Sequence, residues 1–370
     1  MERIPILDLK RQIAPIRQEL DAAIKKIVDQ ANFVFGKEIA DFENSVIRYS
    51  GAQYACGVSN GTDAIRLGLL AMGIEPGDRV LCPAFTYYAT AAAIAGIGAL
   101  PVFADIDPDT YNIAPEQIQI LARKKRIKAV VPVHLYGQCA EMDNIIKICA
   151  KFGLKAVEDT AQAFGASYKG RKAGAIADCG AVSFFPGKNL GAFGDAGMVL
   201  SSNKKIDQAL RLLRNQGNKE KYNHVIIGYN NRLDTLQAAV LEVKLKYLDS
   251  WNRKRQENAK YYNQQLKGLG VTLPFVPVYN EHIYHQYVLR VKSGRDKLMQ
   301  HLIDKGIDAR IYYPQSLHLQ KCFKYLGYRK GDFPASESAA KEVLAIPVYP
   351  DLTKEEKDYI IVSIKEFFKC

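Results

Sequence analysis

The first part of the chain carries apolar side chains at helical spacing. Over residues 8–30 they recur every three or four positions, at Leu9, Ile13, Ile16, Leu20, Ile24 and Ile27. This period places them on one face of a helix. The sequence Phe33-Val-Phe-Gly36 interrupts the pattern, and a second helix is predicted from about Lys37 to Tyr49. We predict that the two helices form an N-terminal arm.

Short apolar runs then alternate with amphipathic stretches. The apolar runs predict strands at 54–58, 79–82, 101–104, 129–133, 155–157, 181–185 and 198–200. The stretches between the first five runs predict helices at about 59–70, 86–97, 114–123 and 142–152. This alternation favours an α/β fold with a mostly parallel sheet covered by helices. Ligands of such sheets bind beyond the carboxyl ends of the strands, so polar residues there are the site candidates.

The remaining pattern predicts more helix and a second, smaller domain. Helices are expected at about 203–214 and 232–249, with the polar segment 215–231 as an exposed loop between them. The segments that follow predict a helix at 251–267, a strand at 284–291, a helix at 295–305, and helices near 336–344 and 354–368. We therefore predict a large domain over 1–249 and a small C-terminal α+β domain over 250–370.

Composition narrows the class of protein. The 370 residues carry a net charge of +12, but the basic residues are scattered and form no block, so neither nucleic acid nor membrane is an expected partner. The seven cysteines are odd in number and include no C-x-x-C pair, and most lie in apolar runs, which suits reduced core thiols in a cytosolic protein. Residues 1–5 lack an apolar signal-peptide core, and no run of about 18 apolar residues predicts a membrane span. No metal site is predicted.

One lysine lies in an unusual place. Lys188 follows the apolar run 181–185 and is surrounded by Gly187, Gly191, Gly194 and Gly197. Glycines let the backbone turn sharply and approach a ligand closely. A lysine amine can form a Schiff base with a carbonyl, and pyridoxal phosphate is the commonest carbonyl cofactor. Taken alone, such a lysine is more often an incidental residue of a surface loop.

A carboxylate and an amide follow one predicted strand. Asp159 ends the run at 155–157, and Gln162 comes three residues later. Asp159 could pair with a protonated pyridine nitrogen and keep the ring a strong electron sink, while Gln162 could hydrogen-bond the ring hydroxyl. The alternative for Asp159 is a helix N-cap.

Three more features lie at strand ends. Asn60-Gly-Thr-Asp63 opens a helix, where backbone N–H groups and the Thr62 hydroxyl could bind an anion, although a plain N-cap explains the turn equally well. Tyr87 could stack on a flat ring, with core packing as the alternative and as the expected role of Phe85 and Tyr88. The hydroxyl of Ser183, five residues before the lysine, could reach a phosphate.

The order of these features along the chain resembles that of the pyridoxal-phosphate-dependent sugar aminotransferases of the DegT/DnrJ type, which have the aspartate aminotransferase fold (fold type I). The resemblance covers nearly the whole chain. Further similar stretches are Phe33–Glu38, Pro101–Ile113, Val131–Gln138, Gly228–Ala239, Tyr284–Tyr287 and Leu344–Pro350.

The resemblance implies a role for each candidate. It assigns the Schiff base and the later proton shuttle to Lys188, ring contacts to Asp159, Gln162 and Tyr87, phosphate contacts to Gly61, Thr62 and Ser183, and a contact with the neighbouring subunit's phosphate to Asn230. The last role implies a homodimer with shared active sites. The implied reaction moves the amino group of L-glutamate to a nucleotide-linked ketosugar and yields an aminosugar nucleotide for polysaccharide or glycoside biosynthesis.

Substrate choice is implied by other stretches. The segment 230–237 looks more like the branch that acts on 3-keto sugars than like the 4-keto branch, which stays as the alternative. By resemblance Arg232 contacts substrate substituents, or instead holds the dimer loop. The region that ends at His318 often faces the sugar, and Tyr312 departs from the histidine that many relatives have before Tyr313-Pro.

Two other functions compete with this hypothesis. A dehydratase of the same fold would replace the lysine with histidine, whereas Lys188 is present. A regulatory or nucleic-acid-binding protein on an inherited fold is favoured only by the net charge of +12, and it has no need for Lys188, Asp159 and Gln162 together.

Overall fold

A seven-stranded sheet forms the centre of the protein. The computed structural model describes residues 3–369. The sheet order is β1-β9-β8-β5-β4-β2-β3, and all neighbours are parallel except those of β9, which runs antiparallel to both β1 and β8. The strands are β1 (Tyr54–Val58), β2 (Arg79–Pro83), β3 (Leu100–Ala104), β4 (Ile127–Val130), β5 (Lys155–Asp159), β8 (Cys179–Ser183) and β9 (Gly197–Ser201). The predicted mostly parallel sheet is thus confirmed.

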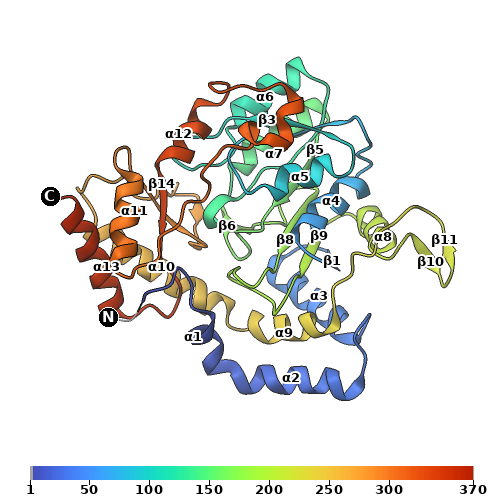
Figure 1. Cartoon of the computed structure of the whole chain (residues 1–370). Coiled ribbons are helices and arrows are strands. Elements are labelled where there is room, and N and C mark those ends of the chain that lie inside the picture. Colours follow the sequence, from blue (N-terminus) through green and yellow to red (C-terminus); the bar gives the residue numbers. More distant parts are fainter. Residues whose placement is uncertain (1–2, 370) are drawn as a thin grey trace.

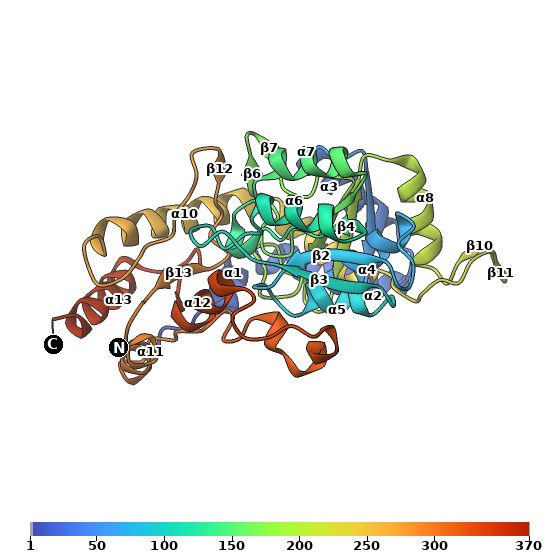
Figure 2. The same ribbon diagram turned by 90° about the horizontal axis from the view of Figure 1, so that it is seen from above.

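Helices cover both faces of this sheet (Figures 1 and 2). One face packs on α4 (Gly61–Ala71), α5 (Ala89–Ala95) and α8 (Lys204–Leu213). The other face packs on α3 (Lys37–Ser50), α6 (Pro115–Lys124), α7 (Met142–Phe152) and α9 (Thr235–Leu245). Both faces of the sheet are buried, and its strands are accordingly near-continuous apolar runs, as a parallel sheet covered on both sides requires.

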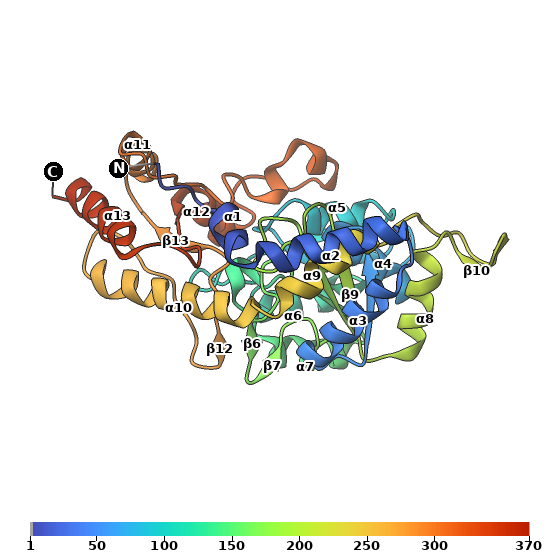
Figure 3. The same cartoon turned by 90° about the horizontal axis from the view of Figure 1, so that it is seen from below.

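The N-terminal helices lie outside these layers of sheet and helices. The short α1 (Leu9–Ile13) leads into α2 (Arg17–Gln30), which lies beside α9 (Figure 3). Ile16 and Leu20 contact Val240, Val243 and Trp251 there. The apolar face predicted from the spacing therefore covers α9 and the start of α10 (Leu248–Gln265).

The C-terminal region has its own core. It contains the antiparallel pair β13 (Tyr287–Arg290) and β14 (Val343–Ile346), with α11 (Arg295–Asp304), α12 (Pro334–Glu342) and α13 (Lys354–Phe367). The far half of α10 contributes Ala259, Tyr262 and Leu266 to this core, and Ile4 from the N-terminal end joins it. None of the helices in residues 3–369 is both long and apolar enough to cross a bilayer.

The structure corrects several predictions. The segment 215–231 is not a plain loop, because β10 (Asn218–Glu220) pairs with β11 (Asn223–His224) in a hairpin that projects from the body (Figures 2 and 3). Strand β14 was missed, since its apolar run follows α12 without a break. Three short strands were also missed: β6 (Ser167–Tyr168) pairs with both β7 (Arg171–Lys172) and β12 (Asn280–Glu281). Phe85 is buried as predicted, whereas Tyr88 is half exposed.

Candidate active site

Strand ends and one helix start converge at the carboxyl edge of the sheet. Asp159 is the last residue of β5, and Ser183 is the last residue of its neighbour β8. Lys188 lies in the turn that connects β8 to β9, and α4 begins at Gly61 directly after the strand β1. The topology therefore brings together residues that lie far apart in the sequence.

The Lys188 side chain is partly accessible, but its amine lies in a desolvated environment. Burial lowers the pKa of Lys188 from its ordinary value to about 8, and the charge of Asp159 opposes this shift. A pKa near 8 leaves about a tenth of the amine neutral at pH 7, far more than an ordinary lysine has. Only the neutral amine is a nucleophile, so this lysine is suited to attack a carbonyl.

This pKa predicts how the apoenzyme captures pyridoxal phosphate. Below about pH 8 the capture rate is expected to rise roughly tenfold per pH unit, because the neutral fraction of the Lys188 amine rises with pH. Above that pH the rate should level off. Stopped-flow absorbance after mixing apoenzyme with the cofactor checks this. A rate that keeps rising to the ordinary lysine pKa would show that Lys188 is not the desolvated amine described here.

Asp159 is buried and has neutral partners. Its Oδ2 accepts a hydrogen bond from the Thr90 hydroxyl at 2.8 Å, and its Oδ1 accepts one from the Ala161 N–H at 3.1 Å. Burial raises the pKa of Asp159, while these two bonds and the charges of Lys188 and His134 lower it. Among residues 3–369 no cationic side chain is hydrogen-bonded to this carboxylate, so it can accept a cation from a ligand.

Gln162 links two parts of the site. Its Oε1 accepts a hydrogen bond from the Tyr136 N–H at 2.9 Å, which fixes the amide orientation, and its Nε2 donates to the Tyr313 hydroxyl at 2.9 Å. One N–H of that amide is left for a ligand oxygen. The Tyr313 ring lies 5.7 Å from the ring of Tyr87, which is 55% exposed. The structure thus places a predicted substrate residue beside two predicted cofactor residues.

The start of α4 is shaped for an anion. Asn60 caps the helix by accepting a hydrogen bond from the Asp63 N–H at 2.9 Å, and the N–H groups of Gly61 and Thr62 have no preceding helical acceptors. A Cβ atom on Gly61 would lie 2.5 Å from the Cβ of Ser183. The Ser183 hydroxyl therefore adjoins the free N–H groups, and together they form a site suited to a phosphate.

This close approach predicts the effect of Gly61→Ala. The added methyl group must displace Ser183 or the first turn of α4, so we expect the affinity for pyridoxal phosphate to fall by about 10- to 100-fold. Gly68→Ala is the matched control, because its Cβ would lie 3.6 Å from Val157, an ordinary contact. Fluorescence titration of both apoenzymes with the cofactor measures the difference. Equal affinities would contradict the predicted phosphate site.

A polar network next to the lysine was missed by the sequence reasoning. Asn189 donates to Asn252 Oδ1 at 2.7 Å and to the Ile283 carbonyl at 3.3 Å, so its Oδ1 must accept from His285 Nδ1 at 3.2 Å. His285 is therefore the tautomer with a free lone pair on Nε2. Burial and the charge of Lys188 hold the pKa of His285 well below its ordinary value, so the ring is neutral. Tyr284–Tyr287 was noted in the sequence only as a similar stretch.

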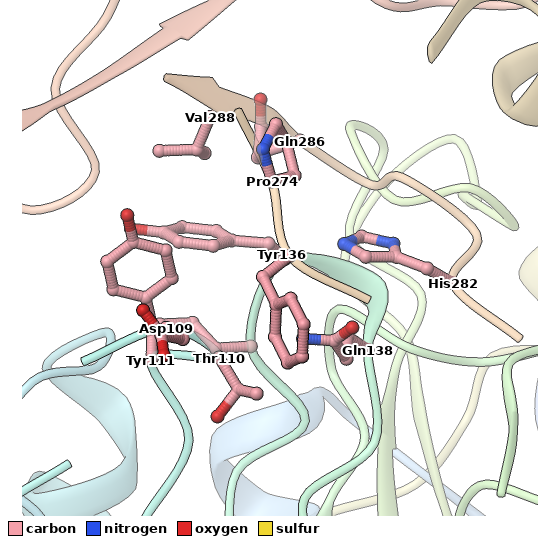
Figure 4. Close-up of a pocket in the computed structure, with 11 residues that line it drawn as sticks. Asp109, Thr110, Tyr111, Tyr136, Gln138, Pro274, His282, Gln286 and Val288 are labelled. Carbon is pink, nitrogen blue, oxygen red and sulfur yellow. The ribbon is translucent and has the colours of Figure 1, made fainter. Parts of the chain in front are cut away.

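A small cavity borders this site. Figure 4 shows Tyr136 and His282 against it. His282 is neutral, because burial lowers its pKa to about 3, and its Nδ1 accepts from the Tyr284 N–H at 2.8 Å. Tyr136 connects the cavity to the site, since its N–H bonds Gln162 and its hydroxyl bonds the Tyr312 carbonyl. None of the predicted cofactor residues lines the cavity.

Three predicted residues lie apart from this cluster. Asn230 is exposed near the base of the projecting hairpin. The guanidinium of Arg232 lies 5.7 Å from the centre of the Phe35 ring, and no carboxylate within residues 3–369 forms an ion pair with it. His318 is buried, with Nε2 3.1 Å from Glu337 Oε1 and its ring against Phe333, so its contacts lie within the protein core.

The donor set fits pyridoxal phosphate. Lys188 suits its aldehyde, Asp159 its ring nitrogen, the exposed face of Tyr87 its ring, and the start of α4 with Ser183 its phosphate. Over residues 3–369 there is no group of three or more potential metal ligands. The site is therefore built for an organic, anionic carbonyl compound.

Comparison with known proteins agrees with this chemistry. The model of the DegT/DnrJ/EryC1/StrS aminotransferase family matches residues 15–365. A protein of Geobacillus stearothermophilus named pleiotropic regulatory protein is 41% identical, over 99% of both chains. UDP-N-acetyl-3-dehydro-alpha-D-glucosamine 3-aminotransferase of Acidithiobacillus ferrooxidans is 40% identical, over 98% of this chain and 97% of its own. The crystal structure of S. venezuelae DesV in complex with a ketimine intermediate superimposes with a TM-score of 0.97, at 38% identity over all of both chains.

Proposed function

Because the chain belongs to the DegT/DnrJ/EryC1/StrS aminotransferase family, it is a pyridoxal-phosphate-dependent aminotransferase, and we propose that it transfers the amino group of L-glutamate to the 3-keto group of a nucleotide-linked sugar. One observation carries the amino-transfer chemistry: Lys188, with its pKa near 8, shares a desolvated site with the buried Asp159. The position of amination is supported by relatives named for C3 chemistry, among them the Acidithiobacillus enzyme and two dTDP-3-amino-sugar transaminases.

Each residue near Lys188 has a holding role in this proposal. Gly61 and Thr62 bind the phosphate through backbone N–H groups, and Ser183 adds its hydroxyl. Gln162 donates its remaining N–H to the ring oxygen, and the face of Tyr87 covers the ring. All of these groups are positioned by strand ends and helix starts, which keeps the site rigid.

Proton movements are assigned to two side chains. Bound pyridoxal phosphate supplies a carbonyl for the amine and an electron sink for the bonds at Cα. Asp159 holds a proton on the ring nitrogen, because its buried carboxylate needs a cationic partner. The freed amine of Lys188 would take the proton from the glutamate Cα and deliver it to the former aldehyde carbon of the cofactor, on the other side of the amino nitrogen. In the second half of the reaction the same amine would move a proton in the opposite direction, to the carbon of the former sugar ketone.

The sugar side of the site is assigned to the C-terminal region. Tyr313 lies against Tyr87 and Gln162, and Tyr312 precedes it, so substrate bound over Tyr87 would meet both. Arg232 lies apart from this cluster within the chain and against Phe35, and it stays a candidate for contacts with an anionic substituent, since no carboxylate within residues 3–369 pairs with it. His318 is buried and contacts Glu337, so we assign it no direct contact with the substrate.

We further propose a homodimer with shared active sites. Large apolar side chains are exposed on the projecting hairpin, where Tyr222 is 83% and Ile227 is 90% exposed. Phe33, Val34 and Phe35 are also exposed. Large apolar side chains exposed in this way are typical of interfaces, and a second copy would cover them. Asn230, at the base of the hairpin, would then reach the neighbouring subunit's phosphate.

A cytoplasmic location completes the proposal. Cys56, Cys82, Cys139, Cys149 and Cys179 are buried free thiols, as is usual in a reducing compartment, and Cys370 lies outside the described residues.

A panel of ketosugars tests the function. We expect glutamate-dependent amination of 3-keto nucleotide sugars, with the amino group at C3 of the product determined by NMR. Amination at C4 of 4-keto substrates instead would favour the alternative branch. No change in the cofactor absorbance on addition of glutamate would overturn the transaminase proposal, and salt-dependent retention on DNA would then favour a regulatory role like that in the name of the Geobacillus relative.

A further inference from the structure

One face of α9 holds the turn that carries Lys188. The Oε1 of Gln237 accepts a hydrogen bond from the Phe193 N–H at 2.8 Å. Two turns further along the helix, the ammonium of Lys244 donates to the carbonyl of Gly191. Residues seven apart lie on the same side of a helix, so both contacts meet the same stretch of chain. The helix thus fixes the glycine-rich turn at two points.

Lys244 is unusual because it is buried without a carboxylate. Its exposed fraction is 1%, and within residues 3–369 it forms no ion pair. The ammonium lies 5.5 Å from the centre of the Phe193 ring and 6.0 Å from that of Trp251, so it faces two aromatic rings in addition to the carbonyl. Burial lowers the pKa of Lys244 to about 8. An uncompensated buried lysine is costly, and packing alone would be served better by methionine.

The turn that carries Lys188 is also held by its own hydrogen bonds and close contacts. Its ends are joined by the bond from the Ala192 N–H to the Phe184 carbonyl at 2.8 Å, and the Lys188 N–H donates to the Phe185 carbonyl at 2.8 Å. A Cβ on Gly191 would lie 2.2 Å from the Pro186 carbonyl oxygen, so the loop closes tightly on itself. A displacement of the Gly191 carbonyl would therefore pass directly to Lys188, three residues away.

We propose that Lys244 is a positioning residue. Its ammonium, together with Gln237, holds the turn so that the Lys188 amine keeps its position relative to the bound cofactor and substrate. The inference rests on the proposed role of Lys188. A shift of about 1 Å in a reacting group can cost about 100-fold in rate, so the effect should appear in kcat. Substrate binding, which uses other residues, should change little.

The test compares two holoenzyme variants, one at Lys244 in α9 and one at Lys246, which directly follows the helix. Lys244→Met keeps the length and removes the charge and the donor, whereas Lys246→Met removes an exposed lysine that pairs with Glu19. For Lys244→Met we expect kcat with glutamate to fall about 10- to 100-fold with KM within about threefold, and a changed pH titration of the cofactor absorbance. Lys246→Met should stay within about twofold. A wild-type kcat and spectrum in folded Lys244→Met, or a loss of thermal stability alone, would overturn the proposal.

A second pair keeps the proposal testable if Lys244→Met does not fold. Gln237→Leu removes the acceptor of the Phe193 N–H, while Gln237→Glu retains an acceptor oxygen. The proposal requires about a tenfold lower kcat in Gln237→Leu and its recovery in Gln237→Glu. Equal kcat values in the two variants would overturn it. Failure of the proposed function itself is recognised separately, because the wild-type protein would then show no spectral response to glutamate.

Discussion

Replacement of Lys188 by alanine is expected to abolish turnover while the protein stays folded. The variant loses both the amine that binds the cofactor covalently and the base that moves the proton, and a positioned base alone contributes about 100- to 10,000-fold. We therefore expect kcat to fall at least about 1,000-fold. The charge of Lys188 is already disfavoured by burial, so the thermal midpoint should fall little.

Borohydride reduction followed by peptide mass spectrometry checks the covalent role. The wild-type protein should carry the reduced cofactor on Lys188, and the alanine variant should carry none. Lys205→Ala, which removes an exposed lysine of α8, is the control and should match wild type in both assays. Cofactor attached to another lysine in the wild-type protein, or more than about a tenth of wild-type kcat in Lys188→Ala, would refute this assignment.

Asp159→Asn is expected to have the second largest effect. An amide cannot supply the negative charge that keeps a proton on the ring nitrogen, so charge that develops at Cα would lose its electron sink. Removal of one preorganised electrostatic partner typically costs about 100- to 1,000-fold, and we expect this loss in the half-reaction with glutamate. Cofactor binding should persist, because the phosphate contacts at Gly61 and Ser183 and the bond to Lys188 are untouched. Single-turnover absorbance measures the loss.

The control for Asp159→Asn is the loss of a surface carboxylate. Asp143 pairs with Lys169 and Arg171 and is 44% exposed, so Asp143→Asn should leave the half-reaction unchanged. The pKa of Asp159 should also differ between the apoenzyme and the holoenzyme. Burial raises this pKa in the apoenzyme, and a cationic ring next to the carboxylate must lower it in the holoenzyme. A half-reaction in Asp159→Asn as fast as in wild type would exclude a charge-holding role.

Much of the fold could be predicted because its signals are local. The alternation of strands and helices between residues 54 and 201 follows from short apolar runs that alternate with stretches of helical apolar spacing. Parallel strands put their carboxyl ends at one edge, so Asp159, Ser183 and Lys188 could be placed together before any contact was known. The missed elements have weak local signals: β10 and β11 are polar and short, and β14 continues directly from α12.

The remaining parts of the site were decided by contacts over long sequence separations. Tyr313 reaches Gln162, and His285 reaches Asn189, across 151 and 96 residues, and no periodic pattern encodes such pairs. Lys244 reads in the sequence as one of many helix lysines, and only the packing of α9 shows that its charge is buried against Gly191. The sequence by itself determined the sheet and the residue types at its edge. The tertiary structure decided which side chains are desolvated, because desolvation depends on everything that packs around a group, and this sets the pKa of Lys188 and Asp159.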